Sequence, residues 1–499
     1  MLLYNTPLLM VLAFLGLTLV AGIYGTKKVT TFREYAVGNK RFRTTTLVVA
    51  VLATIFGGGV LIREVPNIYG SGMSQILLLL IVPVAFWIVS LLGLRMDPFM
   101  EHLSIAETIG SVYGKYPRVI TALLGIYFSI GLIAIEINVM SASIGMCIDS
   151  INPHIVTVLA TLVLITYAML GGVRAITITD MLQFAALTII IPFIVKFLFV
   201  KTNKSFLDVV FLLQKQEKFQ LSHLFQFDRK LLKLVLDDIC SVLVLCPSVI
   251  HRVYMSSSPI QAYKVFSRVT IFSVIILGCI ILISLLVFVG DPILPVTAIW
   301  PYILADMLPV YKGFVIIGLL GMAMSTADSS LHTAAIMASH DMVESIRGVQ
   351  TVPYAHQLRF AKLMILVFGL LAMIVTVYYP DLFELNNFVF TTFVPFFVVA
   401  VTPPFILAVF GFRSSAHTAL IGMTIGILVG LAFEKWLKPE IGICLEFFPQ
   451  IANGLAMMAA HYLLPQSDGK GWIGRNDRQK RMQQLIQAFK KYKKNIDLE

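Results

Sequence analysis

The chain has 499 residues, of which 58% are hydrophobic and only 13% are charged. Soluble domains carry about a quarter of charged residues, so this composition excludes an ordinary soluble protein. The formal net charge of +11 comes from basic residues that flank apolar stretches, without a nucleic-acid-binding motif. We therefore expect a polytopic helical membrane protein that contacts lipid and binds no nucleic acid.

Apolar runs of about 20 residues, the length that crosses a bilayer, recur along the whole chain. The first run has no basic residue before it and no small-residue cleavage site after it, so we expect a retained helix rather than a signal peptide. We count about thirteen runs, at residues 7–26, 44–66, 74–94, 118–148, 154–172, 178–200, 232–254, 265–289, 310–338, 359–379, 385–409, 417–434 and 446–464.

Basic residues predict the orientation, because loops rich in Lys and Arg stay in the cytoplasm. Such residues crowd the loop between Lys27 and Arg43, and they recur in the tail over 466–499. We expect a multi-pass protein of the plasma (inner) membrane. Its N-terminus would lie outside and its C-terminus in the cytoplasm. The loop at 201–232 would then lie outside despite its basic residues, and its first half is typical of an amphipathic surface helix.

Two apolar runs are interrupted in the middle. The run at 44–66 contains the glycines 57–59, and the run at 232–254 contains Pro247. Each feature alone fits a close helix contact or a simple kink. Matching interruptions in two halves of a transporter, however, mark its binding site, since irregular backbone in a membrane lines a cavity or is buried in protein.

The two interrupted runs lie five runs apart, which predicts an all-α core of two inverted five-helix repeats. We place the repeats at about 44–200 and 232–409. Extra helices at 7–26, 417–434 and 446–464 complete a transmembrane domain over 1–465, and a basic cytoplasmic tail follows over 466–499.

One membrane-embedded stretch, "GMAMSTADSSLHTA" at 321–334, is rich in hydroxyls and carries a carboxylate. Ser325, Asp328 and Ser329 share one helix face. The hydroxyls alone could bond to carbonyls one turn back. Asp328 is not explained in this way, because an intramembrane carboxylate is costly and by default functional. Hydroxyls, a carboxylate and carbonyls freed by an unwound helix are suitable ligands for Na⁺.

Four stretches together resemble the sodium:solute symporter family, which includes the proline, pantothenate, choline, sialic acid and glucose symporters. They are "STADSSL" followed by "ASHDM", "GGVRAITITDMLQ" at 171–183, "YAVGNKRF" at 35–42 and "CPSVIHR" at 246–252. Asn39 and Lys40 depart from the usual Gly and Arg of that family. The resemblance implies a LeuT-like fold, inward-moving Na⁺ as the coupling ion, alternating access for a small organic solute, and no enzymatic activity.

The resemblance also implies two sodium sites. The first would use carbonyls at the first-helix break and on the eighth helix together with two hydroxyls: Ala53, Phe56, Met322, Ser325 and Thr326. The second would use Asp180, Ser325, Asp328 and Ser329. Asp328 stands where a hydroxyl is more common, so this second site could bind Na⁺ more tightly or hold a proton.

The solute is expected beside the two breaks. Arg63 and Glu136 would suit a zwitterion or a carboxylate, such as an amino acid or a vitamin. Alternatively, Arg63 pairs with Glu64 at the outer surface, and Glu136 is protonated or bonded to a neighbouring helix. The full set of candidate solute residues is Ile55, Gly57, Val60, Arg63, Glu136, Pro247 and Ser248.

Two other functions stay open from the sequence. Proton coupling could run through Asp328 or Glu136. A solute sensor that has lost transport is the second alternative, although the sequence shows no signalling domain after the last run. The sequence leaves the oligomeric state open, a monomer included.

Overall fold

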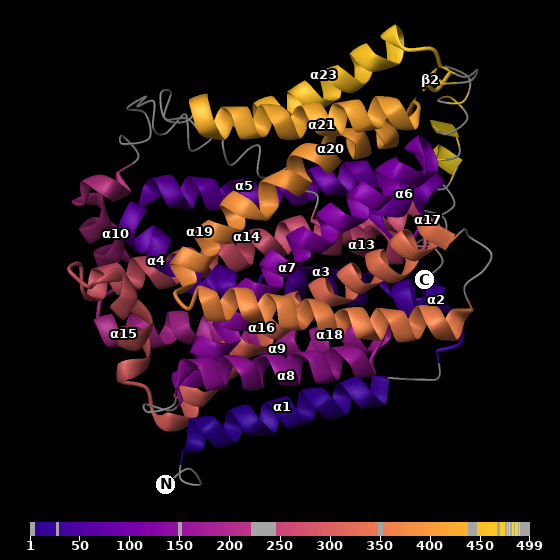
Figure 1. Cartoon of the computed structure of the whole chain (residues 1–499). Helices are drawn as coiled ribbons and strands as arrows, with labels where there is room; N and C mark the ends of the chain where they lie inside the picture. The colour runs from indigo at the N-terminus through magenta and orange to yellow at the C-terminus, as the bar shows by residue number, and fades with distance from the viewer. Residues whose placement is uncertain are drawn as a thin grey trace.

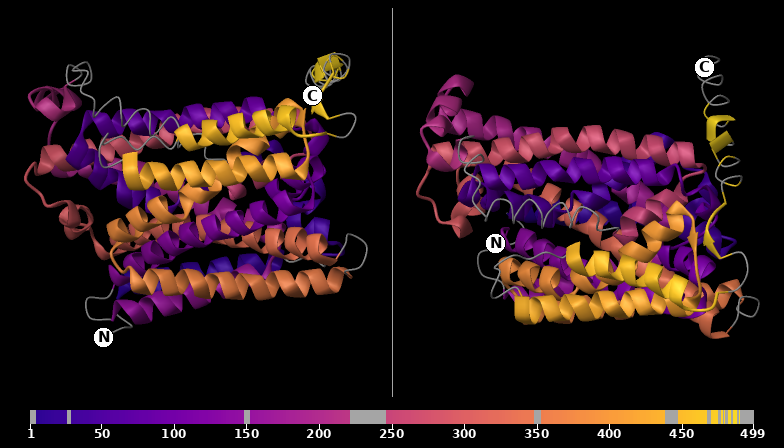
Figure 2. Two further views of the ribbon diagram at one scale, coloured as in Figure 1. Left: turned by 45° about the horizontal axis from the view of Figure 1, so that its top comes forward. Right: turned by 90° about the horizontal axis from the view of Figure 1, so that it is seen from above.

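The computed structural model describes residues 5–25, 29–147, 152–220, 246–347, 353–437, 447–466 and 470–474, with scattered positions up to 489. Long helices that run roughly side by side make up most of this part (Figures 1 and 2). α1 and α8 lie on one side of the bundle, and α21 and α23 lie on the other (Figure 1). The predicted all-α fold class is confirmed.

The first half of the chain contains α1 (Thr6–Gly25), α2 (Phe32–Val37), α3 (Thr44–Ile55), α4 (Gly58–Ser71), α5 (Met73–Gly93), α6 (Ile105–Tyr113), α7 (Lys115–Gly145), α8 (Pro153–Leu170), α9 (Val173–Thr202) and α10 (Phe206–Gln214). Short 3₁₀ turns η2 (Gly38–Lys40), η3 (Asp97–Phe99) and η4 (Glu217–Phe219) connect some of them. α10 coincides with the predicted surface helix.

The second half contains α13 (Pro247–Met255), α14 (Pro259–Gly290), η5 (Val296–Ala298), α15 (Ile299–Ala305), α16 (Pro309–Ile336), the π-helix η6 (Met337–Met342), α17 (Val343–Arg347), α18 (Tyr354–Tyr378), α19 (Leu382–Thr392), α20 (Val394–Phe410), α21 (Ala416–Ala432), the π-helix η7 (Phe433–Leu437) and α23 (Phe447–Leu463). Strand β1 (Phe412–Arg413) pairs antiparallel with β2 (Gly471–Trp472).

Within the described residues, nine helices are long and apolar enough to cross a membrane, or ten if the bent pair α3–α4 is one span. α8 is a shorter apolar helix at a further predicted position, and α23, with 17 residues, lies at the last one. The predicted run at 232–254 lies mostly outside the described residues, and only its end is seen, as α13. The order of helices otherwise follows the prediction.

The predicted break at the glycines is confirmed. α3 and α4 meet at an angle of 56° on either side of Phe56 and Gly57. Gly58 is needed there, because a Cβ atom would lie 2.6 Å from the backbone oxygen of Leu319 and 3.1 Å from the Cβ of Ala323. The glycines therefore allow both a break and a close contact with α16.

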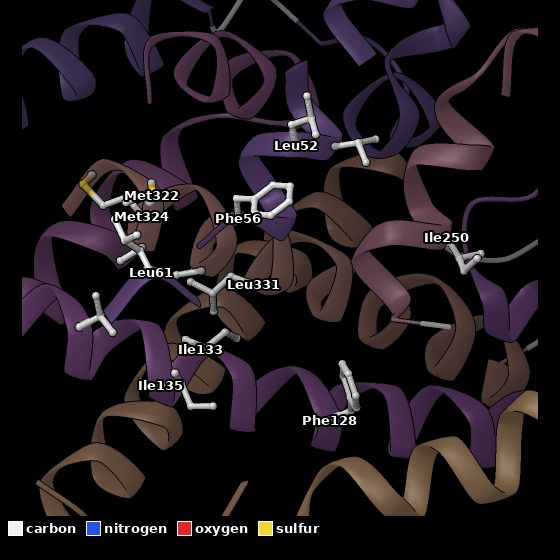
Figure 3. Close-up of a cluster of buried hydrophobic side chains, with 14 of the residues drawn as sticks. Leu52, Phe56, Leu61, Phe128, Ile133, Ile135, Ile250, Met322, Met324 and Leu331 are labelled. Carbon is white, nitrogen blue, oxygen red and sulfur yellow. The ribbon is translucent and has the colours of Figure 1, made fainter. Parts of the chain in front are cut away.

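α16 forms the centre of the bundle. It packs against α7, α9, α1, α18, α3 and α4, and every residue from Gly318 to Ile336 is buried. Polar side chains at its middle can therefore reach only other helices. Met322 and Met324 on α16 lie among apolar side chains of α3, α4 and α7 around the break (Figure 3).

The boundary predicted at residue 465 falls before β2. β2 lies against β1, and the Trp472 ring lies 5.2 Å from the ring of Phe412. The first part of the predicted tail is therefore attached to the bundle. Most of the basic segment after residue 474 lies outside the described residues.

Candidate functional site

The candidate site lies where the break between α3 and α4 meets the middle of α16. α3 ends at Ile55, and the Phe56 amide donates to the carbonyl of Leu52. The carbonyls that follow Leu52 lack helical partners, as at any helix end. The break thus presents free oxygens inside the protein, as the sequence predicts.

Thr326 reaches these freed carbonyls. Its hydroxyl lies 2.9 Å from the carbonyl oxygen of Thr54 and 3.4 Å from that of Met322. The structure thus brings Thr326 and Met322 to the break that contains Ala53 and Phe56, four of the five residues of the first predicted sodium site. Thr54, one residue from Ala53, is the carbonyl that Thr326 contacts directly.

Ser325, the fifth residue of that set, faces α9. Its hydroxyl donates to Asp180 Oδ1 at 2.5 Å. Asp180 is completely buried. The two residues were predicted together for the second sodium site, and the structure places them in direct contact.

Arg252 on α13 completes a buried polar cluster around Asp180. Its Nη2 atom lies 3.1 Å from Asp180 Oδ2 and 2.6 Å from Ser329 Oγ. The same nitrogen lies 3.1 Å from Thr54 Oγ1. The expected second sodium site stays a prediction, and three of its four residues surround or adjoin a guanidinium.

Asp328 faces a different helix. Tyr167 on α8 donates to Asp328 Oδ2 at 2.9 Å and lies 3.0 Å from the carbonyl of Met324. The other carboxylate oxygen, Oδ1, has no hydrogen-bond partner among the described residues. Asp328 thus bonds to Tyr167, whereas Ser325 and Ser329, with which it was predicted to act, bond to Asp180 and Arg252.

Sequence reasoning missed Tyr167, Thr54 and the role of Arg252. Arg252 is the last residue of the quoted stretch "CPSVIHR", and a charge within an apolar run needs a buried partner. That signal could have paired it with a carboxylate, although not with Asp180 in particular. Tyr167 and Thr54 carry no comparable signal, because hydroxyls are common in membrane helices.

Glu136 on α7 also lies at the break. The Gly59 amide donates to its Oε2 at 3.2 Å. A Cβ atom at Gly57 would meet the Glu136 carboxylate and, at 2.5 Å, the hydroxyl of Thr326. Gly57 therefore lies between the predicted solute residue Glu136 and the predicted sodium residue Thr326.

Arg63 lies further along α4 and is held by other partners. It donates through Nε to Glu64 Oε1 at 2.7 Å and through Nη1 to Asn386 on α19 at 2.9 Å. Its guanidinium lies over the ring of Phe390, 5.3 Å from the centroid. The alternative that Arg63 pairs with Glu64 is confirmed, and no hydrogen bond joins Arg63 to Glu136 in the described part.

The remaining predicted solute residues flank the break or begin α13. Ile55 and Val60 are half-buried on either side of it. Pro247 is the first residue of α13, which packs against α3 and α16, and Ser248 beside it is buried. The described part of the second interrupted run thus adjoins the first.

Comparison with known proteins agrees with this architecture. No protein-family model matches the chain. A sodium/sialic acid symporter of Aliivibrio fischeri, NanT, is 20% identical over 482 residues, which cover 91% of this chain and 92% of the relative. A solved Na⁺-coupled sialic acid symporter, substrate-bound and outward-open, superposes with a TM-score of 0.81 at 19% identity, over 93% of this chain and 98% of that one.

The chain has the LeuT-like fold. A second solved structure, MhsT in complex with L-phenylalanine, superposes with a TM-score of 0.54 at 13% identity, over 83% of this chain and 98% of that one. The resemblance to the sodium:solute symporters, first seen in four short stretches, is confirmed along nearly the whole chain. The protein is accordingly a multi-pass membrane protein.

Proposed function

We propose that this protein is a sodium-driven symporter that carries a small organic solute across the membrane. The contact of Thr326 with the freed carbonyl of Thr54 is the observation that supports it most directly. Hydroxyl and carbonyl oxygens converge there inside a broken helix, which is the chemistry that dehydrated Na⁺ requires. The relative from Aliivibrio fischeri is itself a sodium symporter by name.

The coupling ion would bind to five residues that span the break and α16: Ala53, Phe56, Met322, Ser325 and Thr326. The two hydroxyls come from adjacent positions on α16, so they present neighbouring oxygens toward α3 and α9. Binding of Na⁺ would join the broken helix to α16 and so favour one arrangement of the two over another.

The solute would bind beside Glu136, with its charged or hydroxyl donor groups toward that carboxylate. Glu136 is buried and offers oxygens at the break, where its described hydrogen bond comes from the Gly59 amide. A zwitterion or carboxylate, such as an amino acid or a vitamin, is our first candidate. Sialic acid, which also carries a carboxylate, is the second, because two of the similar proteins are sialic acid symporters by name.

Uptake into proteoliposomes tests the function. The purified protein is supplied with labelled amino acids, vitamins and N-acetylneuraminic acid, with an inward Na⁺ gradient, with equal Na⁺ on both sides, or with a proton gradient alone. We expect accumulation of one solute class only with the Na⁺ gradient, and none in protein-free liposomes. Accumulation driven by protons without Na⁺ would favour the proton-coupled alternative, and binding of a solute without uptake would favour a sensor.

We also propose that the N-terminus lies outside and the C-terminal tail in the cytoplasm. The basic residues between Lys27 and Arg43 and in the tail support this orientation. A cysteine introduced at Thr6 should react with a membrane-impermeant thiol reagent in intact cells, whereas one introduced at Gly474 should react only after permeabilisation.

A further inference from the structure

The guanidinium of Arg252 lies where a second sodium ion is expected. Its Nη2 atom has three oxygens within 3.1 Å, from Asp180, Ser329 and Thr54. Asp180 and Ser329 are two of the four residues predicted to hold that ion. A single nitrogen thus occupies two of the oxygens that a metal ion would need at this site.

The position of Arg252 is built into the fold. The side chain of Arg252 is 2% exposed, and that of Asp180 is 0% exposed. Arg252 belongs to α13, which begins at the predicted break at Pro247 and packs against α3 and α16. Guanidinium groups keep their positive charge in proteins, so this cluster always contains a cation.

The carboxylate of Asp180 has both oxygens engaged. Oδ1 accepts from the hydroxyl of Ser325, and Oδ2 accepts from Arg252. Asp328, the extra carboxylate, accepts from Tyr167 on α8 instead. Among the described residues, Asp180, Ser325 and Ser329 thus belong to one cluster whose cation is Arg252, whereas Asp328 bonds to Tyr167.

We propose that Arg252 serves as the built-in cation of the second site, so that this protein binds one Na⁺ and not two. This inference rests on the proposed function. A second Na⁺ at Asp180 and Ser329 would have to approach a like charge within hydrogen-bond distance and displace it from Asp180, the carboxylate with which it forms an ion pair. Like charges in a buried site repel strongly, which disfavours binding of that ion.

One Na⁺ per chain has a measurable consequence for transport. With one coupling ion, the uptake rate depends hyperbolically on the Na⁺ concentration. The largest solute gradient is then the one that a single Na⁺ per solute molecule can drive. A second ion would make the dependence sigmoidal. The remaining ion would bind at the hydroxyl pair of Ser325 and Thr326.

Binding of radioactive sodium to the purified protein, without solute, tests the inference. The wild-type protein should bind one Na⁺ per chain with a Hill coefficient of one. Arg252→Met keeps an unbranched stem but removes the charge, so it should bind a second Na⁺ and show a Hill coefficient that rises toward two. Arg252→Lys should stay at one.

Arg95→Met is the matched control, because the Arg95 guanidinium lies over the ring of Phe410, 4.7 Å from its centroid, away from the cluster. It should bind one Na⁺, as the wild type does. Two Na⁺ per wild-type chain would overturn the inference. A folded, monodisperse Arg252→Met protein that still binds a single Na⁺ would overturn it as well.

Ser329→Ala provides a test that keeps the arginine, in case Arg252→Met does not fold. It removes a hydroxyl that contacts Arg252 and Thr54, so the number and affinity of bound Na⁺ should not change. A marked loss of Na⁺ affinity in Ser329→Ala would contradict the inference. A wild-type protein that binds no Na⁺ at all would instead refute the proposed function, so the two failures are distinguishable.

Discussion

The hydroxyl of Thr326 donates to the carbonyl of Thr54 across the broken helix, at 2.9 Å. Thr326 is separated from Thr54 by more than half of the chain, and this contact ties the middle of α16 to the end of α3. Anything that binds at this point is held by both helices.

The double variant Ser325→Ala and Thr326→Ala should lose Na⁺ affinity. Each hydroxyl bonded to a charged group contributes about 1.5–3 kcal/mol, which is roughly tenfold or more in affinity for each oxygen removed. Solute uptake measured at increasing Na⁺ concentrations gives this affinity. Thr333→Ala on the same helix is the control, because its hydroxyl donates to the carbonyl of Ser329 within α16. Unchanged sodium dependence in the double variant would show that the ion binds elsewhere.

Gly58→Ala should destabilise the protein and impair transport. The added methyl would lie 2.6 Å from the backbone oxygen of Leu319, which cannot move without shifting α16. Overpacking of this kind costs about 1–3 kcal/mol. The unfolding temperature in detergent measures the loss of stability, and solute uptake into proteoliposomes measures the loss of transport. Gly70→Ala on the same helix α4 is the control, since nothing lies within 4 Å of its Cβ position, and it should unfold at or above the wild-type temperature.

Glu136→Gln should raise the KM for the solute strongly and leave the affinity for Na⁺ alone nearly unchanged. Removal of one partner from a buried charged contact costs about 2–5 kcal/mol. Arg63→Gln should have a smaller effect on KM, because Arg63 is already held by Glu64 and Asn386. Uptake kinetics of both variants measure the difference. Equal and large effects would place Arg63 in direct contact with the solute.

Glu107→Gln should destabilise the protein by about 1–3 kcal/mol at neutral pH. Burial is the largest single effect on Glu107 and raises its pKa. The contact with the His340 imidazole at 3.1 Å, the Leu103 amide and the nearby His102 together outweigh burial and lower the pKa to about 2, from 4.5. A carboxyl group whose pKa is lower in the folded state stabilises that state at pH values above its pKa in the unfolded state. This contribution disappears as the pH falls through its pKa in the folded state.

The difference in unfolding temperature between wild type and Glu107→Gln should therefore be fully present just above pH 4.5 and shrink as pH falls toward about 2. Glu384→Gln is the control, because Glu384 is exposed in the first turn of α19. Its difference from wild type should be small at every pH. A Glu107→Gln difference that grows as pH falls would contradict the assigned ion pair.

Much of the architecture followed from local features of the sequence. Apolar runs predicted the membrane helices, and three adjacent glycines predicted the break at Phe56 and Gly57. These are local properties, because hydropathy and backbone freedom depend on residues close together in the chain. The hydroxyl-rich face of α16 was found for the same reason, since its members are three or four residues apart.

Only the tertiary structure decided which side chains meet. Asp328 and Ser329 are adjacent, yet Asp328 accepts from Tyr167 and Ser329 accepts from Arg252. Arg63 could have faced the solute, but α19 supplies Asn386 as its partner. These pairings depend on the rotation and depth of helices that are distant in sequence. Periodicity within one helix specifies its faces, and packing against the other helices selects the neighbour that each face contacts.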